Sequence, residues 1–337
     1  MRKKNTLGLL SVFVLLIAIT VYISLTNGAF DMTVGEVVRT LLRIEGDPKF
    51  DLIIFDFRLP RIVIAALVGM GLGVAGTVIQ GITRNGLADS GILGINAGAG
   101  AAIVIFMFFF QGQLSNLGTA GIMLQPLFGL AGGLLAALLI YFFSFKGGRL
   151  DTERLLLTGI AIGSGFGALS LYVSLKMKSA DFEMATVWIS GSIYNANWVY
   201  ILSMLPWLLI LLPVIYHKAH LLDLFQLEEA TVTSIGVRVE REKSILLLAS
   251  IGVISSCVAV SGSISFIGLM APHIARSLVG TRHRAIIPVS GAVGMLLVLL
   301  ADFIAKTAFS PLEIPVGIVV SIIGVPYFLY LLVKRKQ

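Results

Sequence analysis

The chain has 337 residues, of which 57% are hydrophobic and only 13% are charged, and its mean hydropathy is +0.96. One soluble core cannot bury this much apolar surface, so the composition excludes a soluble globular protein and indicates a membrane protein with several spans. The net charge of +7 would be compatible with nucleic-acid binding, but the basic residues lie mostly in short loops and there is no soluble basic domain to hold a nucleic acid.

The first apolar segment, residues 7–25, follows a short basic N-terminus at residues 2–4. A cleaved secretory signal would have a shorter apolar part, roughly 7–15 residues, and a small-x-small cleavage site, which is not clearly present. We therefore expect a retained first span that enters from the cytoplasm. An outer segment at 27–57 follows, with an amphipathic piece at 34–43.

The rest of the chain alternates long apolar runs with short polar or glycine-rich breaks. Because a helix needs roughly 20 residues to cross a bilayer, we expect further spans at residues 62–82, 92–110, 117–143, 155–175, 199–216, 245–260, 264–271, 286–305 and 316–333. Residues 176–197 are expected to hold a short outer helix around Trp188, and 217–243 form the longest polar insert. The predicted fold class is an all-α polytopic membrane protein with about ten transmembrane helices in one domain, residues 1–337.

The distribution of basic residues gives an orientation. Assigning the loops alternately places seventeen of the twenty-five Lys and Arg residues inside and eight outside. Because positive loops collect on the cytoplasmic side, both termini are predicted to be cytoplasmic.

Residues 261–288 are the one place where an apolar run breaks, becomes basic and resumes. The run at 264–271 is too short for a simple span, and we expect Pro272 to interrupt it because proline lacks an N–H and clashes with the preceding turn. Five basic or titratable residues follow it: His273, Arg276, Arg282, His283 and Arg284. This stretch is therefore expected to face the cytoplasm, although a plain basic turn between two helices would have the same composition.

Common catalytic and metal-binding motifs are missing from the sequence. There is no H-E-x-x-H, no Cys/His cluster with metal spacing and no G-x-x-x-x-G-K-[ST], so we expect neither a bound metal nor ATP hydrolysis by this chain. Ser164, Ser192 and Ser263 have glycine neighbours and could pair with His273 or His283 in an intramembrane hydrolase. Gly-Ser pairs are, however, common in helix packing, and both histidines are expected in a turn at the membrane edge.

The stretch 261–288 resembles the G-x-I-x-F-[IV]-G-L-x-x-P-H-x-x-R signature of the permease subunits of iron-siderophore, haem and vitamin B12 ABC importers, the FecCD-type or type II importers. Gly268, Pro272, His273 and Arg276 occupy signature positions. The resemblance covers nearly the whole chain. It implies the type II permease fold in a bacterial cytoplasmic membrane, with two permease subunits around a conduit and two cytoplasmic ATPases.

The polar insert at 217–243 resembles the segment through which this family couples to its ATPase, and it could form two short helices along the cytoplasmic surface. The positions that carry the resemblance are Leu224, Leu227, Glu228, Glu229, Ala230 and Gly236. Glu228 stands where the family usually has glycine. On composition alone, the insert could also be a solvated charged loop.

Three cations at outer span ends, Arg58, Arg61 and Lys306, are similar to family positions that meet acidic residues of a soluble substrate-binding protein. Charge pairing at a rim steers encounter and fixes register. Lys306 replaces the more usual arginine, which keeps the charge but loses bidentate geometry. Snorkelling of cationic side chains to the membrane interface is the alternative. Glu313, in a motif that resembles the start of the family's last span, could pair with a nearby cation or lie at the pathway mouth.

Two cytoplasmic turns resemble the gating constrictions of the family. The turn at 85–91 resembles N-P-L-A-[DE]-P-G, with glycine and serine in place of both prolines, and it carries Asn85 and Leu87. Thr152 and Glu153 match the second constriction. Asp151 and Thr152 also suit the N-terminal cap of the fifth span.

Together these motifs imply the permease subunit of a binding-protein-dependent ABC importer for a ferric siderophore, with haem or cobalamin as alternative cargoes. The implied partners are a cytoplasmic ATPase that holds ATP and Mg²⁺, a substrate-binding protein outside, a second permease subunit and membrane lipid. No cofactor is expected on this chain. The alternative from another class is an ion-driven secondary transporter, which usually has ionisable residues at mid-membrane. Such residues are nearly absent here, and Asp302 lies close to a span end.

Overall fold

The computed structural model describes residues 3–28, 30, 32–44, 47–89, 91, 94–110, 118–146, 149–310 and 312–334. Some predicted features fall outside these residues: the basic residues at 2, 335 and 336, Ser90 of the gate turn, the expected first residues of two spans at 92 and 117, and residue 311 of the last-span motif.

Long apolar helices make up most of the described chain. Eight are long and apolar enough to cross a membrane: α1 (Lys3–Thr26), α4 (Leu59–Thr83), α6 (Gly118–Ser144), α7 (Thr152–Ser174), α9 (Trp198–His217), α12 (Val239–Ser261), α14 (His283–Thr307) and α15 (Val316–Lys334). Two shorter apolar helices, α5 (Ile95–Phe110) and α13 (Ile267–Val279), occupy the positions of the remaining predicted spans. The all-α class is confirmed.

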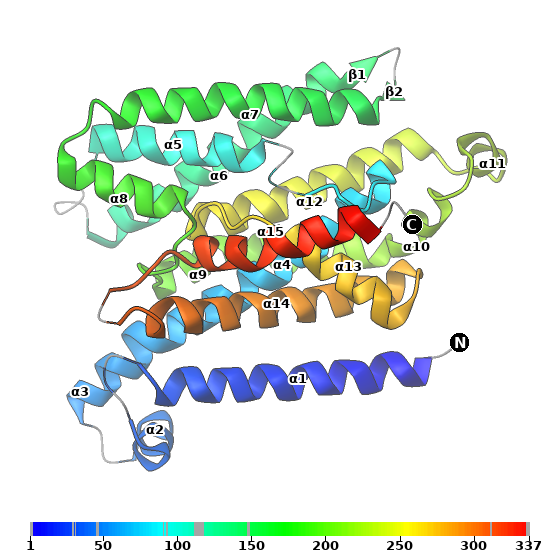
Figure 1. Cartoon of the computed structure of the whole chain (residues 1–337). Helices are drawn as coiled ribbons and strands as arrows, with labels where there is room; N and C mark the ends of the chain where they lie inside the picture. Colours follow the sequence, from blue (N-terminus) through cyan, green and yellow to red (C-terminus); the bar gives the residue numbers. More distant parts are fainter. Residues whose placement is uncertain are drawn as a thin grey trace.

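The long helices lie side by side, and short elements gather at their two ends (Figure 1). One end, called here the α8 end, carries α2 (Val34–Leu41), α3 (Pro48–Asp51) and α8 (Ser179–Ile189). The opposite α11 end carries α10 (Ala219–Leu224), α11 (Glu229–Ser234), and the hairpin of β1 (Phe145–Lys146) and β2 (Arg149–Leu150). The start of α1 and the end of α15 also lie at the α11 end. The helix expected around Trp188 and the two short helices expected in 217–243 are confirmed.

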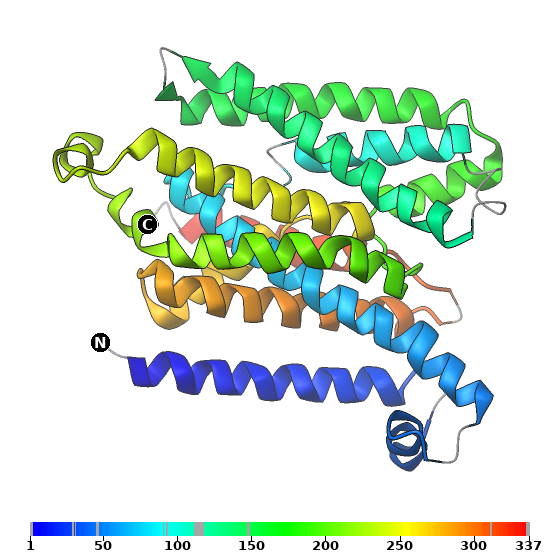
Figure 2. The same cartoon turned by 180° about the vertical axis from the view of Figure 1, so that it is seen from behind.

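Helices α4, α12 and α14 form the buried centre of the chain, and the view from behind shows α9 and α12 alongside α4 (Figure 2). Glycines allow α4 to approach its neighbours closely. A Cβ on Gly69 would come within 2.3 Å of the Gly294 carbonyl oxygen, and one on Gly76 within 2.0 Å of the Gly268 oxygen. Small residues at such crossings let backbones pack directly, which is how helices associate in lipid.

The second span begins earlier than predicted. The helix is continuous from Pro48 through the π-helix η1 (Leu52–Arg58) into α4. Arg58 and Arg61 therefore lie inside a helix and not at its start. Pro60 has no N–H to donate to the carbonyl five residues earlier in the π-helix, that of Phe55. The indole Nε1 of Trp198 donates to this carbonyl instead, at 2.8 Å. The π-helix can therefore accommodate the proline.

The expectation that Pro272 interrupts the eighth span is wrong. Pro272 lies inside α13, and the break precedes the helix, where Gly262 and Phe266 have positive φ. Proline removes the N–H that would bond to the carbonyl of Gly268. Gln80 Nε2 lies 3.4 Å from that oxygen and supplies a donor from α4, so a neighbouring helix makes the proline tolerable.

The basic stretch that follows is also more helical than predicted. His273 lies in α13 with Nδ1 2.6 Å from the Tyr327 hydroxyl, and Arg276 donates to Gln80 Oε1 at 2.8 Å. The turn is short, at 280–282, and His283 is the first residue of α14 and is buried. The basic stretch is therefore spread over α13, a short turn and α14, with Tyr327 on α15 and Gln80 on α4 as partners of His273 and Arg276.

Candidate functional site

A cavity of about 810 Å³ lies among α5, α7, α8, α13 and α15. Small-molecule sites have volumes of roughly 300–1,000 Å³. Its polar lining side chains are Asp89, Asn96, Ser170, Ser174, Thr186, Ser190, Ser263 and Ser265, and its aromatic ones are Phe182, Trp188, Phe266 and Phe328. No cluster of three or more His, Cys, Asp or Glu occurs among the described residues. The lining offers hydrogen bonds and aromatic contact to an organic molecule.

Close backbone contacts lie next to the cavity-lining residues Trp188, Ser190 and Ser263. The N–H of Gly317 donates to the carbonyl of Gly191 at 2.8 Å. A Cβ on Gly262 would come within 1.9 Å of the Trp188 carbonyl oxygen. Gly191 and Gly262 have φ of +81° and +66°, which favours glycine. The end of α8, the break before α13 and the start of α15 therefore meet without side chains between them.

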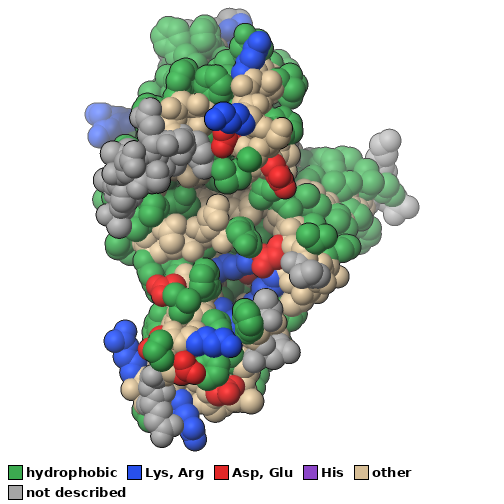
Figure 3. Space-filling view, turned by 90° about the vertical axis from the view of Figure 1, so that its left-hand side faces the viewer, with side chains coloured by type: hydrophobic (Ala, Val, Ile, Leu, Met, Phe, Trp, Pro, Cys, Tyr) green, Lys and Arg blue, Asp and Glu red, His purple; other side chains and the backbone are tan. Residues whose placement is uncertain are grey.

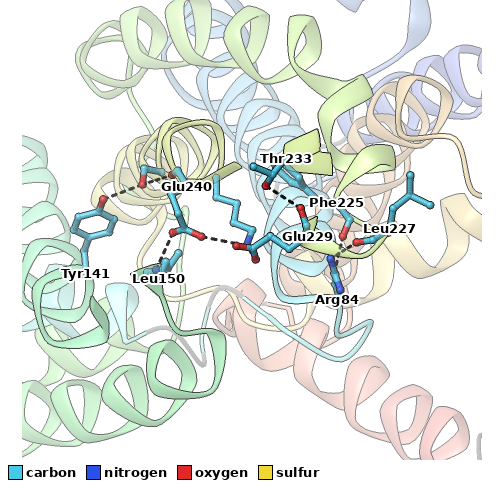
Figure 4. A network of polar contacts seen from close by, with 10 residues as sticks. Arg84, Tyr141, Leu150, Phe225, Leu227, Glu229, Thr233 and Glu240 are labelled. Atoms are coloured by element: carbon cyan, nitrogen blue, oxygen red, sulfur yellow. Dashed lines mark hydrogen bonds and ion pairs between the residues drawn. The ribbon is translucent and has the colours of Figure 1, made fainter. Parts of the chain in front are cut away.

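The gate turn, residues 85–91, runs from the α11 end to the cavity. Arg84 precedes it in a left-handed conformation, with φ of 51°. Its Nε and Nη2 donate to the carbonyls of Phe225 and Leu227 at 2.6 and 2.5 Å, as Figure 4 shows. One side chain thus ties the end of α4 to the predicted coupling segment.

The gate turn itself contacts α13. Asn85 Oδ1 accepts the N–H of Leu87 at 3.0 Å, and Leu87 packs against Leu269 and its neighbours. Asp89 lines the cavity, and its Oδ2 accepts the N–H of Phe266 at 3.3 Å, just before α13 begins. A carboxylate at a helix N-terminus is electrostatically favourable. The turn therefore links the coupling segment, the start of α13 and the cavity.

We call residues 217–243 the coupling platform. Leu221, Leu222, Phe225 and Val232 anchor it as buried apolar residues. Of the predicted coupling residues, Leu224 and Glu229 are half-buried, whereas Leu227, Glu228, Ala230 and Gly236 are exposed. The platform therefore presents a largely open surface at the α11 end of the molecule.

Ion pairs connect the platform to α12 and to the hairpin. Lys243 Nζ lies 3.2 Å from Glu229 and 3.5 Å from Glu240, whose other oxygen accepts the N–H of Leu150 at 2.8 Å (Figure 4). α11 is thus connected through one lysine to the segment between α6 and α7.

Further polar contacts fix the other side of the platform. Asp223 Oδ1 accepts the backbone N–H of His283 at 2.9 Å and lies 2.6 Å from its Nδ1. Gln226 Nε2 donates to the carbonyl of Gly81 at 3.2 Å, and Lys218 pairs with Glu242. A movement of the platform would therefore displace the ends of α4, α12 and α14 together.

The three predicted docking cations lie at the α8 end, on which side chains of both charges appear (Figure 3). Arg61 pairs with Asp302 at 2.8 Å and with Glu313 at 2.7 Å. Glu313 is therefore the partner of a cation, one of its two predicted alternatives. The Arg58 guanidinium donates to carbonyls of residues 25 and 30, and Lys306 Nζ donates to the carbonyl and hydroxyl of Ser24. All three cations have partners within the chain.

The second predicted gate lies on a different part of the α11 end. Thr152 is the first residue of α7, and Asp151 caps that helix by accepting the N–H groups of Glu153 and Arg154 at 3.0 and 3.1 Å. The helix-cap alternative is therefore confirmed for Asp151. The side chain of Glu153 is exposed.

The sequence did not reveal the role of some residues of these sites. Arg84 belongs to the polar break that was noted, but its partners lie more than 140 positions away. Gln80 and Glu240 likewise act on distant segments. A single polar residue at a span end was the only signal available, and it does not identify a partner.

Comparison with known proteins agrees with this arrangement. The model of the FecCD transport family matches residues 15–334. The iron-uptake system permease protein FeuC of Bacillus subtilis is 54% identical over 97% of this chain and 97% of its own. The iron(3+)-hydroxamate import system permease protein FhuG of the same organism is 46% identical over 99% of both chains.

Among solved structures, a metal-chelate type ABC transporter in an inward-facing conformation matches with a TM-score of 0.83 and 30% identity, covering 99% of this chain and 100% of that one. The packing of the long helices is therefore that of a metal-chelate type ABC transporter, and the protein is a multi-pass protein of the bacterial inner membrane. The chain belongs to the FecCD transport family and is a permease subunit of an ABC importer.

Proposed function

We propose that this subunit forms one half of a conduit that carries a ferric siderophore into the cell. Relatives named for iron uptake and iron(3+)-hydroxamate import support this cargo, and the observation that carries the proposal is a cavity large enough for an organic chelate. A partner ATPase holds ATP and Mg²⁺ and hydrolyses ATP, while this chain contributes no catalytic residue and no cofactor or metal. Haem and cobalamin are the alternative cargoes.

A second permease subunit, either a copy or a paralogue, covers α7. This helix is exposed along most of its length within one chain, and Ser164, Gly165 and Gly167 lie on exposed positions. Gly167, Ser170 and Ser174 also line the cavity. The conduit therefore runs between two subunits, next to the cavity described here.

The ATPase docks on the coupling platform at the α11 end, which faces the cytoplasm together with both termini. Exposed Leu227 and Ile235 provide apolar contact, at 49% and 61% exposure. Glu228, Glu229, Ala230 and Gly236 provide the surrounding surface, with Leu224 packed beneath. The contact transmits movement through Arg84 to the gate residues Asn85 and Leu87, with Thr152 and Glu153 as a second constriction.

The substrate-binding protein docks at the opposite end on Arg58, Arg61 and Lys306. Acidic groups on its two lobes would compete with the carbonyls and carboxylates that hold these cations in the isolated chain. An exchange of ionic partners at a rim gives orientation and speed of encounter more than affinity.

The docking proposal predicts that Leu227→Asp prevents co-purification of a tagged ATPase and abolishes uptake, because it places a charge in an apolar contact. Leu42→Asp, which changes an even more exposed leucine at the other end, is the matched control and should retain both. Undiminished ATPase recovery with Leu227→Asp would contradict the docking site.

The cargo is tested by uptake of radioactive iron in cells that lack this chain and carry it on a plasmid. A panel of ferric hydroxamate, ferric catecholate, ferric citrate and haem identifies the class. Restored uptake of any ferric siderophore supports the proposal, and restored uptake of haem alone would replace it.

A further inference from the structure

Two buried side chains of the cavity wall have hydrogen-bonding atoms without a partner. Asn96 on α5 is 6% exposed and Trp188 at the end of α8 is 7% exposed, and both line the cavity. Within the described part of the chain, Asn96 Oδ1 and Trp188 Nε1 are shielded from solvent and make no hydrogen bond. Buried polar groups are nearly always bonded, and an orphan carries a desolvation penalty. These two atoms are therefore unsatisfied in the state described, and a ligand that reached them would remove the penalty.

Both residues contact the break before α13, and α5 also borders the Trp188 ring. A Cβ on Gly100, one helical turn after Asn96, would lie 4.0 Å from the Trp188 ring. Asn96 Nδ2 donates to Ser263 Oγ at 3.0 Å, while Gly262 packs against the Trp188 carbonyl. The break before α13 thus holds both residues.

The two unsatisfied atoms are of opposite kind. Because Asn96 Nδ2 donates to Ser263 Oγ, the atom left without a partner is the amide oxygen, which accepts. The indole N–H of Trp188 can only donate. The wall therefore has one unsatisfied donor and one unsatisfied acceptor.

We propose that Asn96 and Trp188 form a contact site for the cargo, which binds an amide group of an organic iron chelate. The chelate's carbonyl oxygen accepts from Trp188 Nε1, and its N–H donates to Asn96 Oδ1. This deepens the proposed function and rests on it. Because both atoms are closed off in the state described, the wall opens before the contact forms. The neighbouring break, where Gly262 and Phe266 have positive φ, is the segment whose backbone can change conformation.

The test uses the complete complex of permease, ATPase and substrate-binding protein in proteoliposomes. The probes are a ferric chelate with secondary amides and its analogue with N-methylated amides, both labelled with radioactive iron. Trp188→Phe removes the donor and should lower uptake of both chelates per ATP hydrolysed by roughly 5- to 30-fold, the effect of about one hydrogen bond. Asn96→Ala should lower uptake only of the chelate that has amide N–H groups.

A matched variant separates this role from packing. Trp207→Phe shrinks an indole on α9, outside the residues that line the cavity. It should transport each chelate within about 2-fold of wild type. A merely structural role would instead reduce transport of both chelates equally in Asn96→Ala.

Several results would overturn the proposal. Wild-type uptake in both Trp188→Phe and Asn96→Ala would remove the cargo contact while leaving the proposed function intact. Loss of permease pairing in Trp188→Phe on gel filtration would show that the second subunit satisfies these atoms. If the wild-type complex moved no ferric chelate, the proposed function would fail, and the contact site with it.

Discussion

At the residue scale, the chain buries the carboxylate of Asp302, whose negative charge is balanced by a cluster of nearby cations. Asp302 is 1% exposed, and Arg61 Nε lies 2.8 Å from it. A buried charge is expensive unless it is paired, and removing one partner of a buried pair costs about 3–5 kcal/mol. Arg61 therefore stabilises the fold whether or not it also meets a binding protein.

We expect Arg61→Ala to lower the midpoint of thermal unfolding strongly, because Asp302 loses its closest cation. The double variant Arg61→Ala/Asp302→Asn should recover most of the loss, since no uncompensated charge remains. Thermal unfolding of the purified chain in detergent measures both. Equal destabilisation in the single and double variants would contradict the pairing.

At the element scale, direct backbone contacts decide how the central helices pack. On α4, Gly69 faces the Gly294 carbonyl of α14, and Gly73 faces that of Ser290. Hydrophobic burial cannot drive helices together in lipid, so association depends on such close packing. α4 can therefore lie at the centre, because its glycines leave room for the backbones of neighbouring helices to approach it closely.

Gly69→Ala should destabilise the chain by about 1–3 kcal/mol or more, because the new Cβ would collide with the backbone of α14, which cannot rotate away as a side chain could. The matched control is Gly8→Ala on α1, where a Cβ meets nothing within 4 Å and a helical Ala is favoured. Thermal unfolding in detergent distinguishes them. A similar midpoint in both variants would show that the α4–α14 crossing is not tight.

At the scale of the whole molecule, one arginine lies between the platform and the gate turn. Arg84 bonds to the carbonyls of Phe225 and Leu227 and directly precedes the turn that ends at the cavity. Movement at the platform can therefore reach Asp89 and α13 through a short covalent path. In the proposed coupling, this contact positions the gate turn.

Arg84→Ala should leave ATPase co-purification unchanged but lower iron uptake per ATP hydrolysed by roughly 5-fold. The reason is that the hydrogen bonds between the platform carbonyls and the residue before the gate turn are lost. Arg238→Ala, an exposed arginine of the same platform, is the control. The measurement is the ratio of uptake to ATP hydrolysis in proteoliposomes. An unchanged ratio in Arg84→Ala would show that movement travels by another route.

The sequence alone determined the class of protein, the positions of the long apolar helices and the family, because apolar runs of bilayer length and long ordered motifs are local properties. It also located the short helices of the platform and the cap at Asp151. These features depend on the residues near them in the chain.

Only the tertiary structure decided where the helices break and which polar groups meet. Pro60 and Pro272 are tolerated because Trp198 and Gln80 supply donors from distant segments. The partners of Arg61 and Arg84 are likewise remote in sequence, as are the residues that bring Asn96 and Trp188 to one cavity. Such contacts depend on how helices pack in three dimensions, and a local pattern of residues does not contain that information.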